Sequence, residues 1–358
     1  MSACAAEIKL VAPAPGATVS LLSPSQKSWR EATRETRNEF LAGKTPQTRK
    51  IGRQPCPVRL EWTGSGGMFN VRVTKRGSGD VWFQAEVRTN VVEVWNLEVA
   101  RIYDWEVSGG GSCAKGMFRT DDATPRVILI PRSDGTVQEL NMRDLGGIVV
   151  AGRRVKQGMV FRSAGLNGNA KRENGKPVAE GGKKLTQQGV AYMRGRLGIK
   201  IDLDLRSNKE CFGMTASPLG DGVAWAHLPL RAYSGMLNPK VKTACAKCLR
   251  LFLDAENYPI DIHCMGGNDR TASLVVILQG ILGFSEDEIW QDYQFSRVRS
   301  GFSPETGSKY LQTFSEFLKG FDKYDGATLD ERIRKFVIDL GFTEADIEKI
   351  RTIMLEEK

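Results

Sequence analysis

Apolar and polar residues alternate in short runs over the first third of the chain, from residue 8 to about residue 131. Strands that bury one face show this period of two, and clusters of Gly and Pro separate the runs as turns do. Their number and spacing favour a small all-β sandwich. The runs are VRLEW (58–62), FNVRVTK (69–75), VWFQAEVRT (81–89), VVEVWNL (91–97), RIYDWEVSG (101–109) and MFRT (117–120).

One segment of this region, residues 23–43, breaks the alternation. In SPSQKSWREATRETRNEFLAG, residues with high helix propensity replace strand formers, and Ser23 or Ser25 is a suitable helix N-cap. We therefore expect a β-sandwich module over residues 8–131 with a helical insertion near residues 23–43.

Beyond residue 131 the pattern changes to strands that alternate with helices. This change indicates an α/β domain over residues 132–358, with a central sheet flanked by helices. Thr186 is a suitable N-cap, Gly198 and Gly283 follow two helices, and the polar segment 167–184 predicts a mobile loop. Strands are expected at 148–152, 159–163, 199–205 and 258–264, and helices at 185–198, 239–256, 270–283, 286–296, 306–323 and 328–356.

Length and composition fit this two-domain interpretation. The chain has 358 residues, of which 41% are apolar and 26% are charged, close to the averages of soluble globular proteins. No run approaches the roughly 18 consecutive apolar residues of a membrane-spanning helix. The composition also excludes a collagen-like chain and wholesale disorder.

Charge and residue usage narrow the chemistry. The formal net charge of +9 favours anionic or phosphate-bearing partners, although its sign does not separate nucleic acid from a small phosphoester. Two histidines, His227 and His263, and seven cysteines without regular spacing argue against a zinc site. The opening MSACAAEIKLVAPAP has no apolar core of a signal peptide, but its Ala-rich start is compatible with the remnant of a removed leader. Cytoplasmic, periplasmic and secreted locations therefore stay open.

The stretch IDIHCMGGNDRTASLVVILQGILG carries the strongest chemical signal. A buried strand leads into His263 and Cys264, a short loop follows, and Arg270 begins an apolar helix. Amides of such a loop and of the first helical turn converge on one point, where the helix dipole favours an anion. The same field stabilises a thiolate, so Cys264 is a candidate nucleophile and Arg270 a candidate bidentate phosphate clamp. The loop residues between them, which would bind the phosphate, are Met265, Gly266, Gly267 and Asn268.

A second copy of the same spacing tests how specific this signal is. Cys113 and Arg119 in CAKGMFRT also lie six positions apart. Cys113 follows SGGGS at the end of a strand, and no apolar helix follows Arg119. Without a helix N-terminus to stabilise a thiolate, we expect Cys113 to be a structural hairpin residue.

HCMGGNDRT resembles the phosphate loop of protein tyrosine phosphatases, and its surroundings resemble a bacterial tyrosine phosphatase family whose loop usually reads HCxAGKDRTG. The resemblance implies a cysteinyl-phosphate mechanism without a metal or other cofactor. By position it implies that Thr271 hydrogen-bonds the sulfur of Cys264 and that His263 tunes the thiolate from behind. The other matching stretches, in chain order, are NMRDLGG (141–147), GMVFRSAGL (158–166), LGIKIDLDLRSNKE (197–210) and LGFSEDEIWQDYQFS (282–296).

The general acid needs a separate argument, because a carboxyl group must protonate the leaving oxygen. Many tyrosine phosphatases carry this Asp in a Trp-Pro-Asp loop, but WAHLPLRAY (225–233) contains no Asp. Relatives with an Asp before the loop Arg use that residue, so the resemblance favours Asp269 as the acid over a residue that only caps the helix. Asn268 stands where the family often has Lys, and Ala272 where it often has Gly; the missing Lys favours phosphotyrosine or a less charged substrate.

Three further residues follow a buried strand in DLDLRSNKE. Asp204, Arg206 and Glu210 lie at its carboxyl end, where ligand sites of α/β folds form. Asp204 and Arg206 are candidates for supporting the site, and we interpret Arg206 and Glu210 as a structural ion pair rather than as substrate contacts. Cys245 and Cys248 form a C-x-x-C pair, but its place inside a predicted helix argues against redox chemistry.

These observations predict a cysteine-dependent phosphatase for a phosphorylated protein, with tyrosine or dual specificity. A phosphatase for inositol phosphates or phosphoinositides is the second interpretation, supported by Asp269, the net charge and the basic segment 171–184. The third is a module that binds phosphorylated ligands without turnover, against which the intact Cys264, Asp269 and Arg270 argue. YDWEVSGGGSCAKGMFRTDDATPR resembles the last hairpin of fibronectin type III-like modules, so the sandwich is a candidate binding site for a protein partner. We expect no nucleic acid partner.

Overall fold

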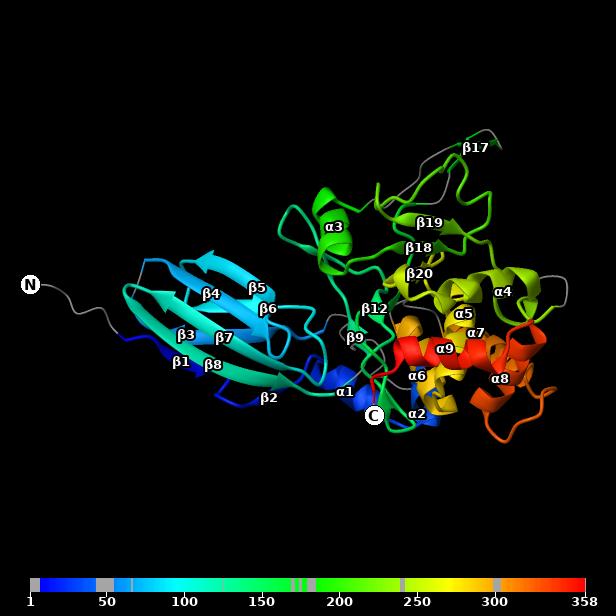
Figure 1. Ribbon diagram of the computed structural model, residues 1–358, viewed down its shortest axis with the longest axis horizontal. Helices are drawn as coiled ribbons and strands as arrows, with labels where there is room; N and C mark the ends of the chain where they lie inside the picture. The colour runs from blue at the N-terminus through cyan, green and yellow to red at the C-terminus, as the bar shows by residue number, and fades with distance from the viewer. Residues whose placement is uncertain are drawn as a thin grey trace, which may run out of the picture. The chain divides into compact units, whose positions relative to one another are not determined.

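The computed structural model describes residues 7–42, 55–65, 67–123, 125–168, 171–173, 176–178, 185–238, 242–298 and 304–357. The chain divides into two compact units, which Figure 1 colours mainly blue to cyan and green to red. The first unit comprises Met1–Lys27 and Gln54–Arg126, and the second comprises Ser28–Arg53 and Val127–Lys358. The division after Arg126 lies five residues before the boundary expected at 131.

The first unit contains two β-sheets, as the alternating pattern predicts. One sheet has three strands and the other has five, and only the short strand β2 joins its neighbour in parallel. The first sheet has the order β1 (Lys9–Ala12), β3 (Val58–Thr63) and β6 (Val91–Val94). The second has the order β2 (Thr18–Val19), β8 (Ser112–Thr120), β7 (Ile102–Gly109), β4 (Phe69–Lys75) and β5 (Asp80–Val87).

The core of this unit consists of alternate residues of these strands. Trp62 of β3, Val71 of β4 and Trp105 of β7 are buried together, while the intervening residues are more exposed. Tyr103, near the start of β7, accepts a hydrogen bond from the amide of Glu98 at 2.9 Å through its hydroxyl oxygen. This bond ties the start of β7 to the chain that precedes it.

The expected helical insertion is present as two helices, α1 (Pro24–Glu31) and α2 (Arg34–Leu41). The hydroxyl of Ser23 accepts a hydrogen bond from the amide of Gln26, so Ser23 rather than Ser25 caps α1. Residues from Ser28 onward group with the second unit, and α2 packs on two of its helices, α6 (Glu286–Val298) and α7 (Pro304–Lys319). Figure 1 shows the blue α2 among these helices.

A mixed six-stranded sheet forms the centre of the second unit. The strands β19 (Ala224–His227), β18 (Ile201–Asp204), β20 (Ile260–His263) and β15 (Val160–Ser163) are parallel neighbours in that order, whereas β12 (Arg143–Asp144) runs antiparallel to β15. Strands β18 (IDLD) and β20 (IDIH) alternate apolar with charged or polar residues, and all their residues are buried, as in a parallel sheet covered on both faces. The order of the whole sheet is β19, β18, β20, β15, β12 and β9 (Arg126–Val127).

Helix α5 (Arg270–Leu282) is the central helix of this unit. Every residue from Thr271 to Leu282 is buried, and the helix packs on β15 and β20 as well as on α6, α8 and α9. Gly283 ends it in the left-handed conformation (φ 92°), as predicted. The remaining helices are α3 (Gln187–Ala191), continued by a π-helix (Tyr192–Arg196), α4 (Lys242–Arg250), α8 (Leu329–Asp339) and α9 (Glu344–Met354).

Three local predictions differ from the structure. The helical pattern at 328–356 forms two helices, because Gly341 adopts φ 89° and Thr343 starts α9 with a capping box. The segment 148–152 contributes only β13 (Val149–Val150), which pairs with β14 (Arg153–Arg154) outside the central sheet. The expected loop at 167–184 includes a hairpin of β16 (Lys171–Glu173) and β17 (Lys176–Val178), and its other residues from 169 to 184 lie outside the described part.

Two short strands, β10 (Ile130–Pro131) and β11 (Val137–Gln138), form a further hairpin. Among the helices of the described residues, none is long and apolar enough to cross a membrane.

Candidate functional site

The predicted phosphate loop lies between β20 and α5. His263 ends β20 and pairs in register with Asp204 at the end of β18 and with Ser163 at the end of β15. Because these strands are parallel, their carboxyl ends meet at one edge of the sheet. The tertiary fold therefore brings residues 163–168, 204–214 and 264–270 to the same edge.

The loop backbone is held from outside by donors that bind its carbonyl groups. Arg162 donates to the carbonyl of Gly267 at 2.7 Å, and Gly165 donates its amide to the carbonyl of Met265 at 3.0 Å. The side-chain amide of Asn141 donates to the carbonyl of Gly266 at 3.2 Å and to the side-chain oxygen of Asn268 at 3.0 Å. With these carbonyls bound on the outside, loop amides are available to an anion on the inside.

Cys264, the predicted nucleophile, is 2% exposed at the start of this loop. Burial alone would raise the pKa of its thiol. The hydroxyl and amide of Thr271, the charge of Arg270 and the amide of Gly267 outweigh burial and hold that pKa below its ordinary value. The buried Thr271 hydroxyl lowers that pKa more than any other group does. The surroundings favour a thiolate.

Arg270, the predicted phosphate clamp, is held by Glu210. Its two terminal nitrogens donate to the two carboxylate oxygens of Glu210 at 2.6 and 2.8 Å. Burial opposes the charge of Glu210, but Arg270 and the Ser207 amide and hydroxyl lower its pKa to about 2. The interpretation of Glu210 as the partner of Arg206 is wrong, because Glu210 orients the guanidinium beside Cys264 instead.

His263 lies behind the loop in a fully buried charged cluster. Its Nε2 is 2.6 Å from Asp202 Oδ1, and its Nδ1 is 3.3 Å from the carbonyl oxygen of Cys264. Burial lowers the pKa of His263, but Asp202 and Asp204 outweigh burial and raise it to about 9. The imidazole is therefore charged at neutral pH and contacts the backbone of Cys264.

Asp204 and Arg206 form a buried ion pair next to this cluster. The Nε of Arg206 is 2.9 Å from Asp204 Oδ1, and its Nη2 is 2.7 Å from Asp204 Oδ2. Arg206 also donates to the side-chain oxygen of Asn167 at 2.9 Å, and Cys211 donates to Asp204 at 3.2 Å. Asp204 and Arg206 therefore hold together chain segments beside the phosphate loop, in the interior of the protein.

Asp269, the predicted acid, occupies the N-cap position of α5 without capping it, since its side chain makes no cap hydrogen bond. Instead, its Oδ1 accepts hydrogen bonds from the hydroxyl of Tyr233 and from Nη2 of Arg297. The side chain is 40% exposed, so solvent or a substrate can reach it.

Comparison with known proteins identifies the family of this arrangement. A model described as "Tyrosine phosphatase family" matches residues 137–356. The chain belongs to the tyrosine phosphatase family. The predicted membership of the tyrosine phosphatases is thereby confirmed, and this tyrosine phosphatase family member is a cysteine-dependent phosphatase.

Two solved structures that match this chain carry the name Siw14. The core catalytic domain of PP-IP phosphatase SIW14 from S. cerevisiae, in complex with citrate, is 17% identical, with 43% of this chain and 80% of that chain covered and a TM-score of 0.27. A structure of the Siw14 catalytic core is 17% identical, with 61% of this chain and 96% of that chain covered and a TM-score of 0.30. A search of the curated proteins finds no match.

Three other cysteines of the described residues, Cys113, Cys245 and Cys248, lack this environment. Cys113 is exposed in β8, and it lies six strand positions from Arg119, a distance of roughly 20 Å. Cys245 and Cys248 are buried in α4, where burial raises both pKa values, that of Cys248 to about 12. In the described segments, no three His, Cys, Asp or Glu side chains form a group that could hold a metal ion.

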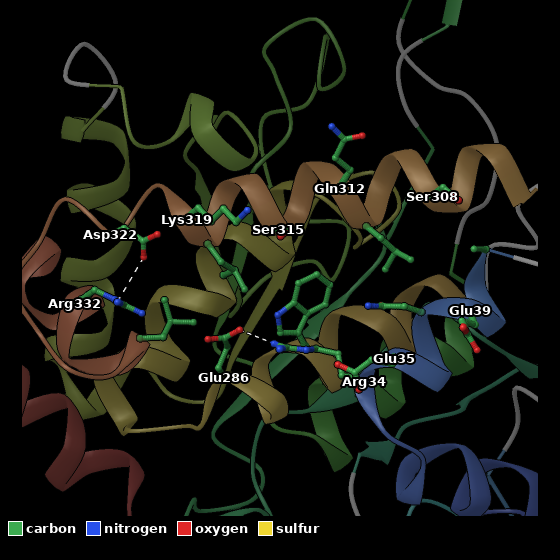
Figure 2. Close-up of a pocket in the computed structure, with 16 residues that line it drawn as sticks. Arg34, Glu35, Glu39, Glu286, Ser308, Gln312, Ser315, Lys319, Asp322 and Arg332 are labelled. Atoms are coloured by element: carbon green, nitrogen blue, oxygen red, sulfur yellow. Dashed lines mark hydrogen bonds and ion pairs between the residues drawn. The ribbon is translucent and has the colours of Figure 1, made fainter.

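Figure 2 shows a pocket between α2, α6, α7 and α8 that does not contain this site. Its lining includes none of residues 263–271. Trp290 lies in its wall, and charged residues around it form ion pairs with one another, Arg34 with Glu286 and Arg332 with Asp322. The predicted chemistry therefore belongs to the phosphate loop and not to this pocket.

Sequence reasoning missed several residues that act on the loop. Glu210 was assigned to another partner, and Tyr233 and Arg297 were not singled out. These residues are 60, 36 and 28 positions from the loop residues that they contact. Asn141 and Glu210 lie in stretches of the sequence that resemble the family. This resemblance is the one sequence signal that could have indicated their role at the loop.

Two adjacent glycines of the loop allow a matched test of its geometry. Gly267 has φ 69°, and a Cβ there would lie 2.4 Å from the carbonyl oxygen of Ser163, whereas a Cβ on Gly266 would meet only the side chain of Asn268 at 3.2 Å. We expect Gly267→Ala to lower phosphatase kcat/KM by about 100-fold or more, and Gly266→Ala by less than about fivefold. Steady-state kinetics and thermal unfolding of both variants check this; equal losses would mean that the close approach at Gly267 is unimportant.

Proposed function

We propose that the protein hydrolyses phosphomonoesters of proteins, with phosphotyrosine as the preferred group. The observation that carries the proposal is the environment of Cys264. A buried thiol whose pKa is held down by Thr271, Arg270 and a loop amide is suited to attack phosphorus at neutral pH. Arg270, oriented by Glu210, is suited to bind two oxygens of the phosphoryl group.

The proposed reaction has two steps. In the first, the thiolate of Cys264 forms a bond to phosphorus, the bond from phosphorus to the ester oxygen breaks, and the leaving oxygen takes a proton from Asp269. In the second, Asp269 takes a proton from water, the water oxygen bonds to phosphorus, and the sulfur–phosphorus bond breaks to return the thiolate and release phosphate. His263 and Thr271 support the thiolate, and the amides of residues 265–268 bind the equatorial oxygens.

Two exposed apolar side chains support an aryl leaving group. Met265 follows the nucleophile directly and is 58% exposed, and Phe212 is 50% exposed. Phe212 is two residues from Glu210, so their Cα atoms are at most ~7 Å apart, and Glu210 binds Arg270. Exposed apolar side chains near the phosphate loop suit the ring of a phosphotyrosine better than a heavily charged substrate. The neutral Asn268 next to Asp269 supports the same choice.

The second candidate is a phosphatase for inositol phosphates or phosphoinositides. Asp269, the net charge of +9 and the basic segment 171–184 support it, although the side chains of that segment lie outside the described residues. The third candidate binds phosphorylated ligands without turnover, and the intact Cys264, Asp269 and Arg270 argue against it.

We also propose that the β-sandwich is a fibronectin type III-like module that binds a protein partner. Fibronectin type III domains share the two-sheet sandwich architecture. The sheets of three and five strands and the bond between Tyr103 and Glu98 support this assignment. The loop HCMGGNDRT resembles the loop of a bacterial tyrosine phosphatase family, which supports assigning this protein to the bacterial members.

Phosphate release from a phosphotyrosine peptide and from inositol polyphosphates, measured side by side with EDTA present, tests the proposal. We expect release from the peptide and none from the Cys264→Ser variant. Preference for the inositol substrates would favour the second candidate. Silence on both substrates would favour the binding module.

A further inference from the structure

We propose that Tyr233 and Arg297 are positioning residues that hold Asp269 ready to transfer a proton. The proposal rests on the proposed function, in which Asp269 is the general acid. Both residues act through Asp269 and are assigned no contact with substrate. They come from different parts of the chain, Tyr233 from the segment after β19 and Arg297 from the last turn of α6.

The contacts of Asp269 are one-sided. The hydroxyl of Tyr233 and Nη2 of Arg297 both donate to Oδ1. An oxygen that accepts hydrogen bonds from a cation and a phenol is poorly suited to carry a proton. The transferable proton therefore sits on Oδ2, and the two donors fix the direction in which Oδ2 faces. Such fixing matters because Asp269 makes no cap hydrogen bond that would hold it.

Arg297 is itself held rigidly. It is buried, its guanidinium carbon lies 3.9 Å from the ring centroid of Tyr310, and its Nη2 donates to the hydroxyls of Tyr233 at 2.7 Å and Tyr293 at 2.9 Å. The hydroxyls of Tyr233 and Tyr293 are 3.0 Å apart, and Tyr293 donates to the carbonyl of Tyr310 at 3.1 Å. Oδ1 of Asp269 therefore joins a hydrogen-bonded network of two tyrosine hydroxyls and one cation.

The backbone of Tyr233 indicates that its position is imposed. Tyr233 adopts φ 54°, a left-handed conformation that a bulky residue rarely takes. Its amide donates to the hydroxyl of Ser273 at 2.7 Å, and that hydroxyl donates to the carbonyl of Asp269 at 2.9 Å. Ser273 thus ties the backbone of Tyr233 to the backbone of Asp269, while the phenol reaches the carboxylate. The segment WAHLPLRAY, which lacks an acid, supplies a residue that orients one.

The test compares two substrates. The leaving group of phenyl phosphate depends strongly on protonation, and that of p-nitrophenyl phosphate depends on it less. We expect Tyr233→Phe to lower kcat for phenyl phosphate about tenfold and for p-nitrophenyl phosphate less than about threefold, with KM unchanged. Arg297→Met should show the same selectivity with a larger loss, about 30-fold or more on phenyl phosphate, and Arg297→Lys should recover part of it. Tyr258→Phe removes another buried hydroxyl, which donates to the carbonyl of Phe252 at 2.8 Å, and should change neither rate.

Asp269→Asn is the reference that separates the two levels of the proposal. Suppose that Asp269→Asn lowers kcat for phenyl phosphate more than kcat for p-nitrophenyl phosphate, whereas Tyr233→Phe lowers both kcat values equally. Tyr233 is then merely structural, and the inference is overturned. If Asp269→Asn does not distinguish them, Asp269 is not the acid, and the proposed function fails at this residue together with the inference. Circular dichroism and thermal unfolding check that each variant is folded. If Arg297→Met does not fold, Tyr233→Phe, which keeps the aromatic ring, tests the inference alone.

Discussion

Replacing Cys264 with serine is expected to lower turnover by at least about 10⁴-fold while inorganic phosphate still binds. The serine hydroxyl is far less ionised than a thiol whose pKa Thr271, Arg270 and Gly267 hold down against burial. Arg270 and the loop amides are unchanged in the variant, so an anion keeps its partners. Phosphate release measures the first effect, and calorimetric titration with inorganic phosphate measures the second.

The second cysteine with the same spacing provides the control. Cys113→Ser should leave activity within about twofold, because Cys113 is exposed on a strand and the next element of the chain is another strand rather than a helix. A difference absorbance titration of wild type against Cys264→Ser should show a thiol that ionises below the ordinary cysteine range. Activity of Cys264→Ser close to wild type would refute the cysteinyl-phosphate mechanism.

Replacing Asp269 with asparagine is expected to slow the enzyme in proportion to the basicity of the leaving group. An amide cannot protonate the departing oxygen, and a general acid contributes about 10²–10⁴-fold. We expect kcat for phenyl phosphate to fall by about 10²-fold or more and kcat for p-nitrophenyl phosphate by about tenfold or less. Steady-state kinetics with a series of substituted phenyl phosphates measures the dependence on the leaving group.

Asp254 provides a matched control for this change, because it also precedes a helical turn and its carboxylate accepts a hydrogen bond from the amide of Glu256. Asp254→Asn should leave both rates within about twofold. Equal losses on every leaving group in Asp269→Asn would show that the residue serves the structure of the loop rather than proton transfer.

Most of the successful predictions came from patterns among residues that are close in sequence. The period of two in β3, β4 and β7 reflects one buried face, and the structure shows that alternation directly. The apolar run of helix α5 reflects its burial, and the predicted strands β18 and β20 are likewise buried at every residue. The phosphate loop was recognisable because strand, loop and helix are contiguous, and the same context distinguished Cys264 from Cys113.

Predictions about side-chain partners were weaker, as Arg206 shows. Its nearness in sequence to Glu210 suggested an ion pair, but Arg206 binds Asp204 and Glu210 binds Arg270, 60 residues away. A charged side chain has several oppositely charged neighbours along the chain, and only the packing of β18 against β20 determines which of them it meets.

By itself, the sequence determined the two-part architecture, the phosphate loop and the chemical type of the site, because each follows from local periodicity or from a contiguous motif. Only the tertiary structure decided what holds that site in place. Glu210 on Arg270, Asn141 on the loop carbonyls, and Tyr233 with Arg297 on Asp269 join positions 28 to 126 residues apart. Such contacts leave no period and no spacing in the sequence, because they arise where parallel strand ends and helix ends converge in space.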